Sequence, residues 1–126
     1  MAQLHFVTQQ EVKHLIDLSA NDGIIPNENV QYVALFSSNE IVSIGGFIIK
    51  GKTALFKGDY TPETHRCKGY HKTLLIGRMN IVRDNYKVKK IIANCTPMSL
   101  KLYLSIGFKI VKQYKNGITS VVAIFN

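Results

Sequence analysis

A chain of 126 residues with 46% apolar residues and a net charge of +8 is long enough to bury one hydrophobic core, and its composition excludes a disordered chain. No apolar run approaches the ~20 residues of a membrane-spanning helix, and the N-terminus lacks the pattern of a signal peptide. The two cysteines, Cys67 and Cys95, are too few for a disulfide framework. These features predict one domain over residues 1–126, located in the cytoplasm and without a membrane partner.

The first half of the chain predicts a strand, a helix and three further strands. A short strand at 4–7 precedes Thr8, a helix N-cap with Glu11 three residues on, and apolar residues at helical spacing follow. The polar stretch 21–29 ends this pattern. Three segments rich in β-branched and aromatic residues then indicate an antiparallel meander, at 30–36, 40–50 and 53–60. Gly45 and Gly46 within it indicate a bulge or a close backbone approach.

The second half predicts two helices around a short strand, and then a hairpin. Apolar residues recur at helical spacing through about residue 85, at Leu74, Leu75, Met79 and Val82. After a strand at 89–95, Pro97 suits the first turn of a helix that ends at Gly107. Strands at 108–114 and 118–125 flank an Asn-Gly turn. This order of elements, β-α-β-β-β-α-β-α-β-β, predicts an α/β (α+β) fold with a mixed sheet and helices on both faces.

A basic segment at 64–72 comes directly before the first of these two helices. The backbone N–H groups of a first helical turn have no partners within the helix, and the macrodipole adds partial positive charge there. A short basic loop with a glycine at this place is therefore suited to a phosphate or pyrophosphate group. The alternative is an ordinary basic helix start, and a second motif bears on that choice.

The second motif occupies residues 96–108. Arg66 and Gly69 match the pattern Arg/Gln-x-x-Gly-x-Gly/Ala, while Tyr103, Gly107 and Phe108 match Asn-x-x-Ala-x-x-x-Tyr-x-x-x-Gly-Phe. On these residues the chain resembles the GCN5-related N-acetyltransferase (GNAT) family, in which the first pattern is the pyrophosphate loop. The resemblance covers nearly the whole chain, with the matching residues concentrated between 60 and 108.

Three positions depart from the family's motifs. His71 stands in place of the small third residue of the loop, Thr96 in place of Asn, and Ser99 in place of Ala. The family keeps a small side chain at the first position so that helix and strand pack closely. We therefore expect these departures to affect cofactor affinity rather than the fold.

The resemblance implies a fold and a cofactor site. The fold is a mixed, mostly antiparallel sheet of about six to seven strands, flanked by helices on both faces, in which acetyl-CoA lies between two parallel strands that splay apart. Here these would be the strands that end at Tyr60 and Cys95. The implied contacts of acetyl-CoA are Tyr60, Thr61, Arg66, Cys67, Lys68, Gly69, Tyr70, His71, Lys72, Thr96 and Ser99.

The resemblance also implies a chemistry, the direct transfer of an acetyl group from acetyl-CoA to an amine. Tyr103 matches the family's general acid, which protonates the leaving thiolate. Asp59 and Glu63 are the acidic residues closest to the expected reaction centre, and Asp59 is the candidate general base. His65 and His71 are other candidate proton carriers, because unperturbed histidine titrates near neutrality. A water relay is a further alternative to a base.

Two other groups of residues give weaker evidence of a functional site. His65, Cys67 and His71 lie close in sequence, but no second cluster of metal ligands accompanies them, so we expect no metal site. Cys95 at a strand end is expected to be a small buried apolar residue rather than a nucleophile. The expected chemistry therefore depends on the two motifs.

Charge bears on the acceptor. Residues 1–65 carry a balance of −3 and residues 66–126 a balance of +11. Asp17, Asp22 and Glu28, in the first helix and the loop after it, would suit a cationic amine on a small molecule or a protein. The basic second half would instead suit a nucleic acid whose base amine is acylated, or it would only keep the protein soluble. A third interpretation is a coenzyme-A-binding or interaction module without turnover, and a homodimer also stays open.

Overall fold

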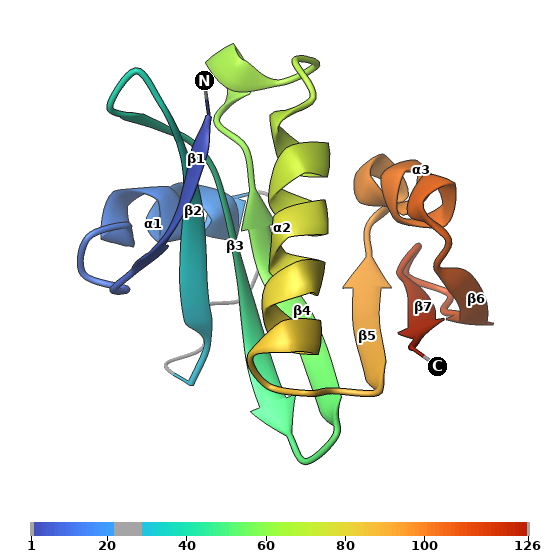
Figure 1. Ribbon diagram of the computed structural model, residues 1–126. Coiled ribbons are helices and arrows are strands. Elements are labelled where there is room, and N and C mark those ends of the chain that lie inside the picture. The colour runs from blue at the N-terminus through green and yellow to red at the C-terminus, as the bar shows by residue number, and fades with distance from the viewer. Residues whose placement is uncertain (1, 22–28, 126) are drawn as a thin grey trace.

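The computed structural model describes residues 2–21 and 29–125 (Figure 1). In these residues a single sheet has the strand order β1-β2-β3-β4-β5-β7-β6, and every neighbouring pair is antiparallel except β4 and β5, which are parallel. The strands are β1 (Gln3–Val7), β2 (Gln31–Ser37), β3 (Glu40–Lys50), β4 (Thr53–Tyr60), β5 (Lys90–Cys95), β6 (Lys109–Gln113) and β7 (Thr119–Ile124). The helices are α1 (Lys13–Asn21), the short 3-10 helix η1 (Glu63–His65), α2 (Tyr70–Asp84) and α3 (Pro97–Ile106).

The predicted order of elements is confirmed, but the first helix begins later than predicted. The expected capping box does form: the backbone N–H of Thr8 donates to Glu11 Oε1 (2.9 Å), and the N–H of Glu11 donates to Thr8 Oγ1 (3.1 Å). It caps a tighter turn, in which the N–H of Val12 donates to the carbonyl of Gln9 (3.2 Å), and α1 starts at Lys13.

Helices cover both faces of the sheet, as predicted (Figure 1). The core on one face joins Leu74 and Leu75 of α2 and Tyr103 of α3 to the strands. The core on the other face joins α1 to Tyr32 and Ile44. Within the described segments, no helix is long and apolar enough to cross a membrane.

The parallel strands β4 and β5 part before they end. Their pairing runs from Thr53 opposite Lys90 to Phe56 opposite Ala93, and the residues of β4 after Phe56 have no partner on β5. The splayed pair that the sequence predicted is therefore present. An opening forms at the carboxyl ends of the two strands.

A bulge in β4 decides which side chains face this opening. Gly46 of β3 lies opposite Lys57 while Ile44 lies opposite Tyr60, so β4 holds one residue more than β3 over this stretch, next to the predicted Gly45-Gly46 irregularity. One extra residue shifts the alternation of side chains between the faces of a sheet. Asp59 therefore contacts α2, and Tyr60 packs in the core on the α1 side.

Candidate active site

A cavity of about 1040 Å³ lies where β4 and β5 part. Its volume is at the upper end of the range for small-molecule sites, roughly 300–1,000 Å³. Every predicted contact of acetyl-CoA lines it except Lys68, which is exposed outside it. The predicted contacts that line it are Tyr60, Thr61, Arg66, Cys67, Gly69, Tyr70, His71, Lys72, Thr96 and Ser99.

The basic loop forms one end of the cavity and leads into α2. Gly69 is the residue before the helix, in the left-handed conformation (φ 81°), and among the described residues no side chain caps the first N–H groups. The Arg66 Nε donates to the carbonyl of Thr61 (2.8 Å), and its guanidinium lies 5.6 Å from the ring centre of Tyr60. Arg66 thus ties the loop to the end of β4 and brings positive charge to a free helix N-terminus.

The α2 side of the cavity contains a buried ion pair. Arg78 of α2 is fully buried, and it donates to Asp59 through Nη1 (2.6 Å to Oδ1) and Nη2 (2.8 Å to Oδ2). Nη1 also donates to the carbonyl of Gly46 (2.8 Å), and the guanidinium lies over the Phe56 ring at 4.1 Å. Arg78 Nε is the one buried side-chain polar atom without a hydrogen-bond partner in the part of the chain that the structure describes.

Arg78 is a site residue that the sequence reasoning missed. It lies four residues after Leu74 and four before Val82, so it belongs to the buried stripe of α2. A Cβ on Gly45 would lie 2.6 Å from Arg78 Nη1. A charged residue in an apolar stripe, with paired glycines on a predicted strand, is the signal that could have found it.

Asp59 gathers three donors on its carboxylate. Its Oδ2 accepts from Arg78, from His71 Nε2 (3.0 Å) and from the hydroxyl of Tyr103. Burial alone would raise the pKa of Asp59, but the charge of Arg78 and the hydrogen bonds hold this pKa far below its usual range. These surroundings favour the ionised form of Asp59 and disfavour its uptake of a proton, and its role as general base stays a prediction.

Tyr103 of α3 lines the cavity. Its hydroxyl donates to Asp59 and accepts from Arg78 Nη2 (3.2 Å), and its ring packs edge-on against Phe108. Burial and the charge of Asp59 raise the pKa of Tyr103 well above its ordinary value, while the charge of Arg78 lowers it. The phenol can therefore lose its proton only where nearby positive charge stabilises the phenolate.

The remaining candidates have other surroundings. His65 lines the cavity, and its Nε2 lies 3.1 Å from Glu40 Oε1, whereas Glu63 is exposed in η1 and is not a lining residue. Cys95 is buried, and burial raises its pKa to about 11, which disfavours a nucleophilic thiolate. No group of three metal-ligating side chains occurs within residues 2–21 and 29–125. Asp17 forms an exposed ion pair with Lys13, and the predicted acceptor residues 22 and 28 lie outside the described residues.

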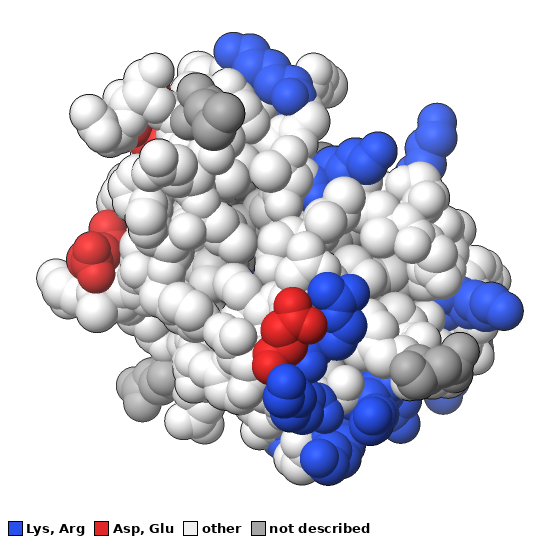
Figure 2. Space-filling model, viewed as in Figure 1, with Lys and Arg blue, Asp and Glu red and all other residues white. Residues whose placement is uncertain are grey.

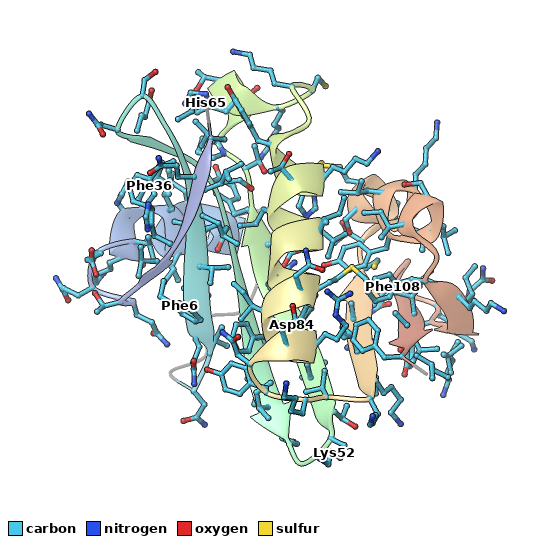
Figure 3. The ribbon with its side chains drawn as sticks, in the orientation of Figure 1. Phe6, Phe36, Lys52, His65, Asp84 and Phe108 are labelled. Atoms are coloured by element: carbon cyan, nitrogen blue, oxygen red, sulfur yellow. The ribbon has the colours of Figure 1, made fainter. Side chains whose placement is uncertain are left out.

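Positive charge gathers at the end of the sheet opposite the cavity (Figure 2). Lys50 and Lys52 flank the turn between β3 and β4, Lys87 and Lys89 lie between α2 and β5, and Lys90 is the first residue of β5. The two segments touch, because the N–H of Lys89 donates to the carbonyl of Lys52 (2.7 Å). We call these five exposed residues the lysine-rich end. Figure 3 shows Lys52 at this end and His65 at the other.

The fold is that of solved N-acetyltransferases over the full length of the chain. An IAA acetyltransferase from Bacillus cereus has a TM-score of 0.81 at 15% identity, with 99% of this chain and 100% of that chain covered. The PaiA N-acetyltransferase from Thermoplasma acidophilum has a TM-score of 0.78 at 12% identity, with 99% of both chains covered. The N-acetyltransferase PseH from Campylobacter jejuni has a TM-score of 0.72 at 19% identity, with both chains fully covered (100%). No family model and no curated protein matches the sequence. The chain has the GNAT, or acyl-CoA N-acyltransferase, fold.

Proposed function

We propose that the protein is an acetyl-CoA-dependent N-acetyltransferase. The observation that carries this proposal is the cavity between the parted strands β4 and β5, with an uncapped, basic helix N-terminus at its rim. The pyrophosphate of acetyl-CoA suits the N–H groups of the first turn of α2. The pantetheine arm suits the edge of β4 that β5 leaves free. The solved structures of PaiA and PseH contain coenzyme A and acetyl-CoA, respectively, which supports the same ligand here.

The proposed reaction is direct transfer in a ternary complex. The amine attacks the thioester carbonyl, so that a C–N bond forms, the C–S bond breaks, and one proton passes from nitrogen to sulfur. A backbone N–H near Asp59 or Tyr60 polarises the carbonyl, a contribution of about 10²–10³ in rate. Tyr103 is the proposed acid for the thiolate, and Arg78, which donates to its oxygen, stabilises the phenolate.

The proposed acceptor is an amine on a small molecule or a protein. A nucleic acid as acceptor is less well supported, because the lysine-rich end and the cavity lie at opposite ends of β4 and β5. With a rise of about 3.3 Å per residue, the seven steps along β4 from Lys52 to Asp59 separate these lysines from the proposed reaction centre by roughly 20 Å. A nucleic acid bound to those lysines would lie away from the cavity.

Calorimetric titration with acetyl-CoA tests the proposal, followed by mass spectrometry of a panel of polyamines, amino acids and peptides. We expect micromolar binding, about −8 kcal/mol, and acetylation of at least one amine. Binding without transfer to any member of a broad panel would favour a coenzyme-A-binding module. No binding at millimolar acetyl-CoA would contradict the proposal.

A further inference from the structure

We propose that His71 accepts the proton of the acceptor amine, and that Asp59 and Arg78 are positioning residues that hold it ready. This inference rests on the proposed acetyl transfer and adds to it the residue that removes the proton. His71 replaces a small residue of the motif that the chain resembles. Its imidazole therefore occupies a place where the resemblance implies almost no side chain.

His71 lies at the second position of α2, and its side chain enters the cavity. The side chain is 25% exposed, and its Nε2 lies 3.0 Å from Asp59 Oδ2. The ring centre is 6.3 Å from the ring centre of Tyr103. The imidazole thus stands beside the proposed acid, with one nitrogen already bound.

Asp59 fixes which nitrogen of His71 carries the proton. An ionised carboxylate can only accept hydrogen bonds, so the Nε2 of a neutral His71 must carry the hydrogen and Nδ1 must hold the lone pair. Nδ1 has no hydrogen-bond partner among the residues that the structure describes, and it is not one of their buried unpartnered atoms. A basic nitrogen is therefore accessible on a ring that lines the cavity.

Arg78 explains why the base is His71 and not Asp59. The guanidinium holds Asp59 ionised through two hydrogen bonds, so the carboxylate stays an acceptor throughout the reaction. The other charged residues around this part of the cavity are cations: Arg78 binds the same carboxylate, and Lys57, Arg66 and Lys72 line the cavity. Among the described residues that line the cavity, Asp59 is the one acidic side chain, and it contacts the imidazole directly. The positive charge of an imidazolium is therefore offset at the place where it forms.

The proton transfers balance within the cluster of His71, Asp59, Arg78 and Tyr103. As the C–N bond forms and the C–S bond breaks, the amine proton moves to His71 Nδ1 and the thiolate takes the proton of Tyr103. The cluster then holds an imidazolium and a phenolate in place of two neutral side chains, and its net charge is unchanged. This matters because a buried cluster resists any change of net charge. His71 and Tyr103 both line the cavity, so after the products leave His71 Nδ1 gives its proton to solvent and Tyr103 takes one up from solvent, which restores both side chains.

The decisive variant is His71→Gln, because a glutamine amide can donate to Asp59 much as Nε2–H does but has no basic nitrogen. We expect acetyl-CoA affinity within about twofold of the parent and a fall in kcat of about 10²-fold, the usual scale of general base catalysis. The decline of kcat/KM toward acid pH should disappear. The matched control is His5→Gln, on β1 three strands away from β4, which should leave affinity, kcat and pH profile unchanged.

Two results would overturn the role of His71 while leaving the proposed function intact. One is a His71→Gln protein with the turnover and pH profile of the parent. The other is a variant that loses acetyl-CoA affinity but keeps its turnover at saturation, which would make His71 a cofactor contact. If the parent itself transfers no acetyl group, the proposed function fails instead.

A second measurement needs no activity. In ¹⁵N spectra of histidine-labelled protein, the signal that disappears in His71→Gln should belong to a neutral ring with its proton on Nε2. Asp59→Asn should shift this tautomer equilibrium, since an amide can donate as well as accept. A proton on Nδ1 in the parent would contradict the proposed arrangement.

Discussion

The charge of Arg78 is tolerated in the core because both carboxylate oxygens of Asp59 accept hydrogen bonds from it there. The Phe56 ring and the carbonyl of Gly46 also contact the guanidinium, but Nε has no hydrogen-bond partner among the described residues, which costs about 1–3 kcal/mol. A pair of this kind contributes little net stability, whereas breaking it is costly. The role of the pair at this place is to keep Asp59 ionised and to fix its position.

Removing one member of the pair should therefore cost more than removing both. We expect Arg78→Met to lower the free energy of unfolding by about 3–5 kcal/mol, because it leaves a buried carboxylate unpaired. The double variant Arg78→Met, Asp59→Asn should recover part of that loss. Urea unfolding of the parent, both single variants and the double variant measures the coupling. Strictly additive effects would show that the two side chains act independently.

Asp59 should also affect how the free energy of unfolding changes at acid pH. Its pKa is lower in the folded protein than in the unfolded chain, so its contribution to stability is complete above the unfolded value near ~3.9 and is lost as the pH falls toward the folded value. Below pH 4 the unfolded chain binds one more proton, and stability falls by about 1.4 kcal/mol per pH unit. We expect a shallower slope between pH 4 and 3 in Asp59→Asn. Glu11 and Asp84, whose pKa values are also lowered, are present in both proteins; equal slopes would contradict the assignment.

Tyr103→Phe separates proton donation from packing. The ring and its contact with Phe108 stay, while the hydroxyl that Arg78 and Asp59 hold is lost. We expect kcat to fall about 10- to 100-fold, with little change in acetyl-CoA affinity. This loss is at or below the lower end of the usual range for acid–base catalysis. Tyr114→Phe, at an exposed hairpin residue, is the matched control. A Tyr103→Phe protein as active as the parent would remove the role of general acid.

At the scale of elements, the strands could be predicted because their signals are local. β3 and β4 have the predicted bounds, since β-branched residues fill them and turn residues separate them. The orientation of Asp59 could not be predicted, because it depends on one extra residue in β4 relative to β3. The burial of Arg78 could not be predicted either, because its partner lies 19 residues earlier in the chain. The motifs predicted where the cavity lies, but the side-chain contacts across it could be identified only from the fold.

The junction of the basic loop with α2 is the element that should decide cofactor binding. Gly69 has φ 81°, and a Cβ there would meet no atom of the described residues within 4 Å, so a side chain would project into open space beside the helix N-terminus. We expect Gly69→Glu to abolish acetyl-CoA binding in calorimetry, because a carboxylate would repel the pyrophosphate. Gly69→Asn is the matched control, since asparagine tolerates this conformation and adds no charge. Unchanged affinity in a folded Gly69→Glu protein would refute the pyrophosphate site.

At the scale of the whole molecule, the sheet ends in an exposed strand. All residues of β6 are exposed, among them Ile110 (45%) and Val111 (64%). Apolar residues on a free strand edge favour contact with another chain. The homodimer stays a prediction, for which sedimentation of the purified protein is the direct measurement.

The lysine-rich end should bind a polyanion independently of the cavity. We expect labelled duplex DNA to bind through phosphate contacts, with log K falling against log salt at a slope of about −4 for four to five contacts. Lys52→Glu and Lys89→Glu should weaken this binding in fluorescence anisotropy, while Lys112→Glu on β6, with the same change of charge, should weaken it far less. Saturating acetyl-CoA should leave bound DNA in place, because the cavity lies at the other end of β4 and β5. Displacement by acetyl-CoA would instead mean that DNA occupies the cavity, and equal losses in all three variants would mean that only net charge matters.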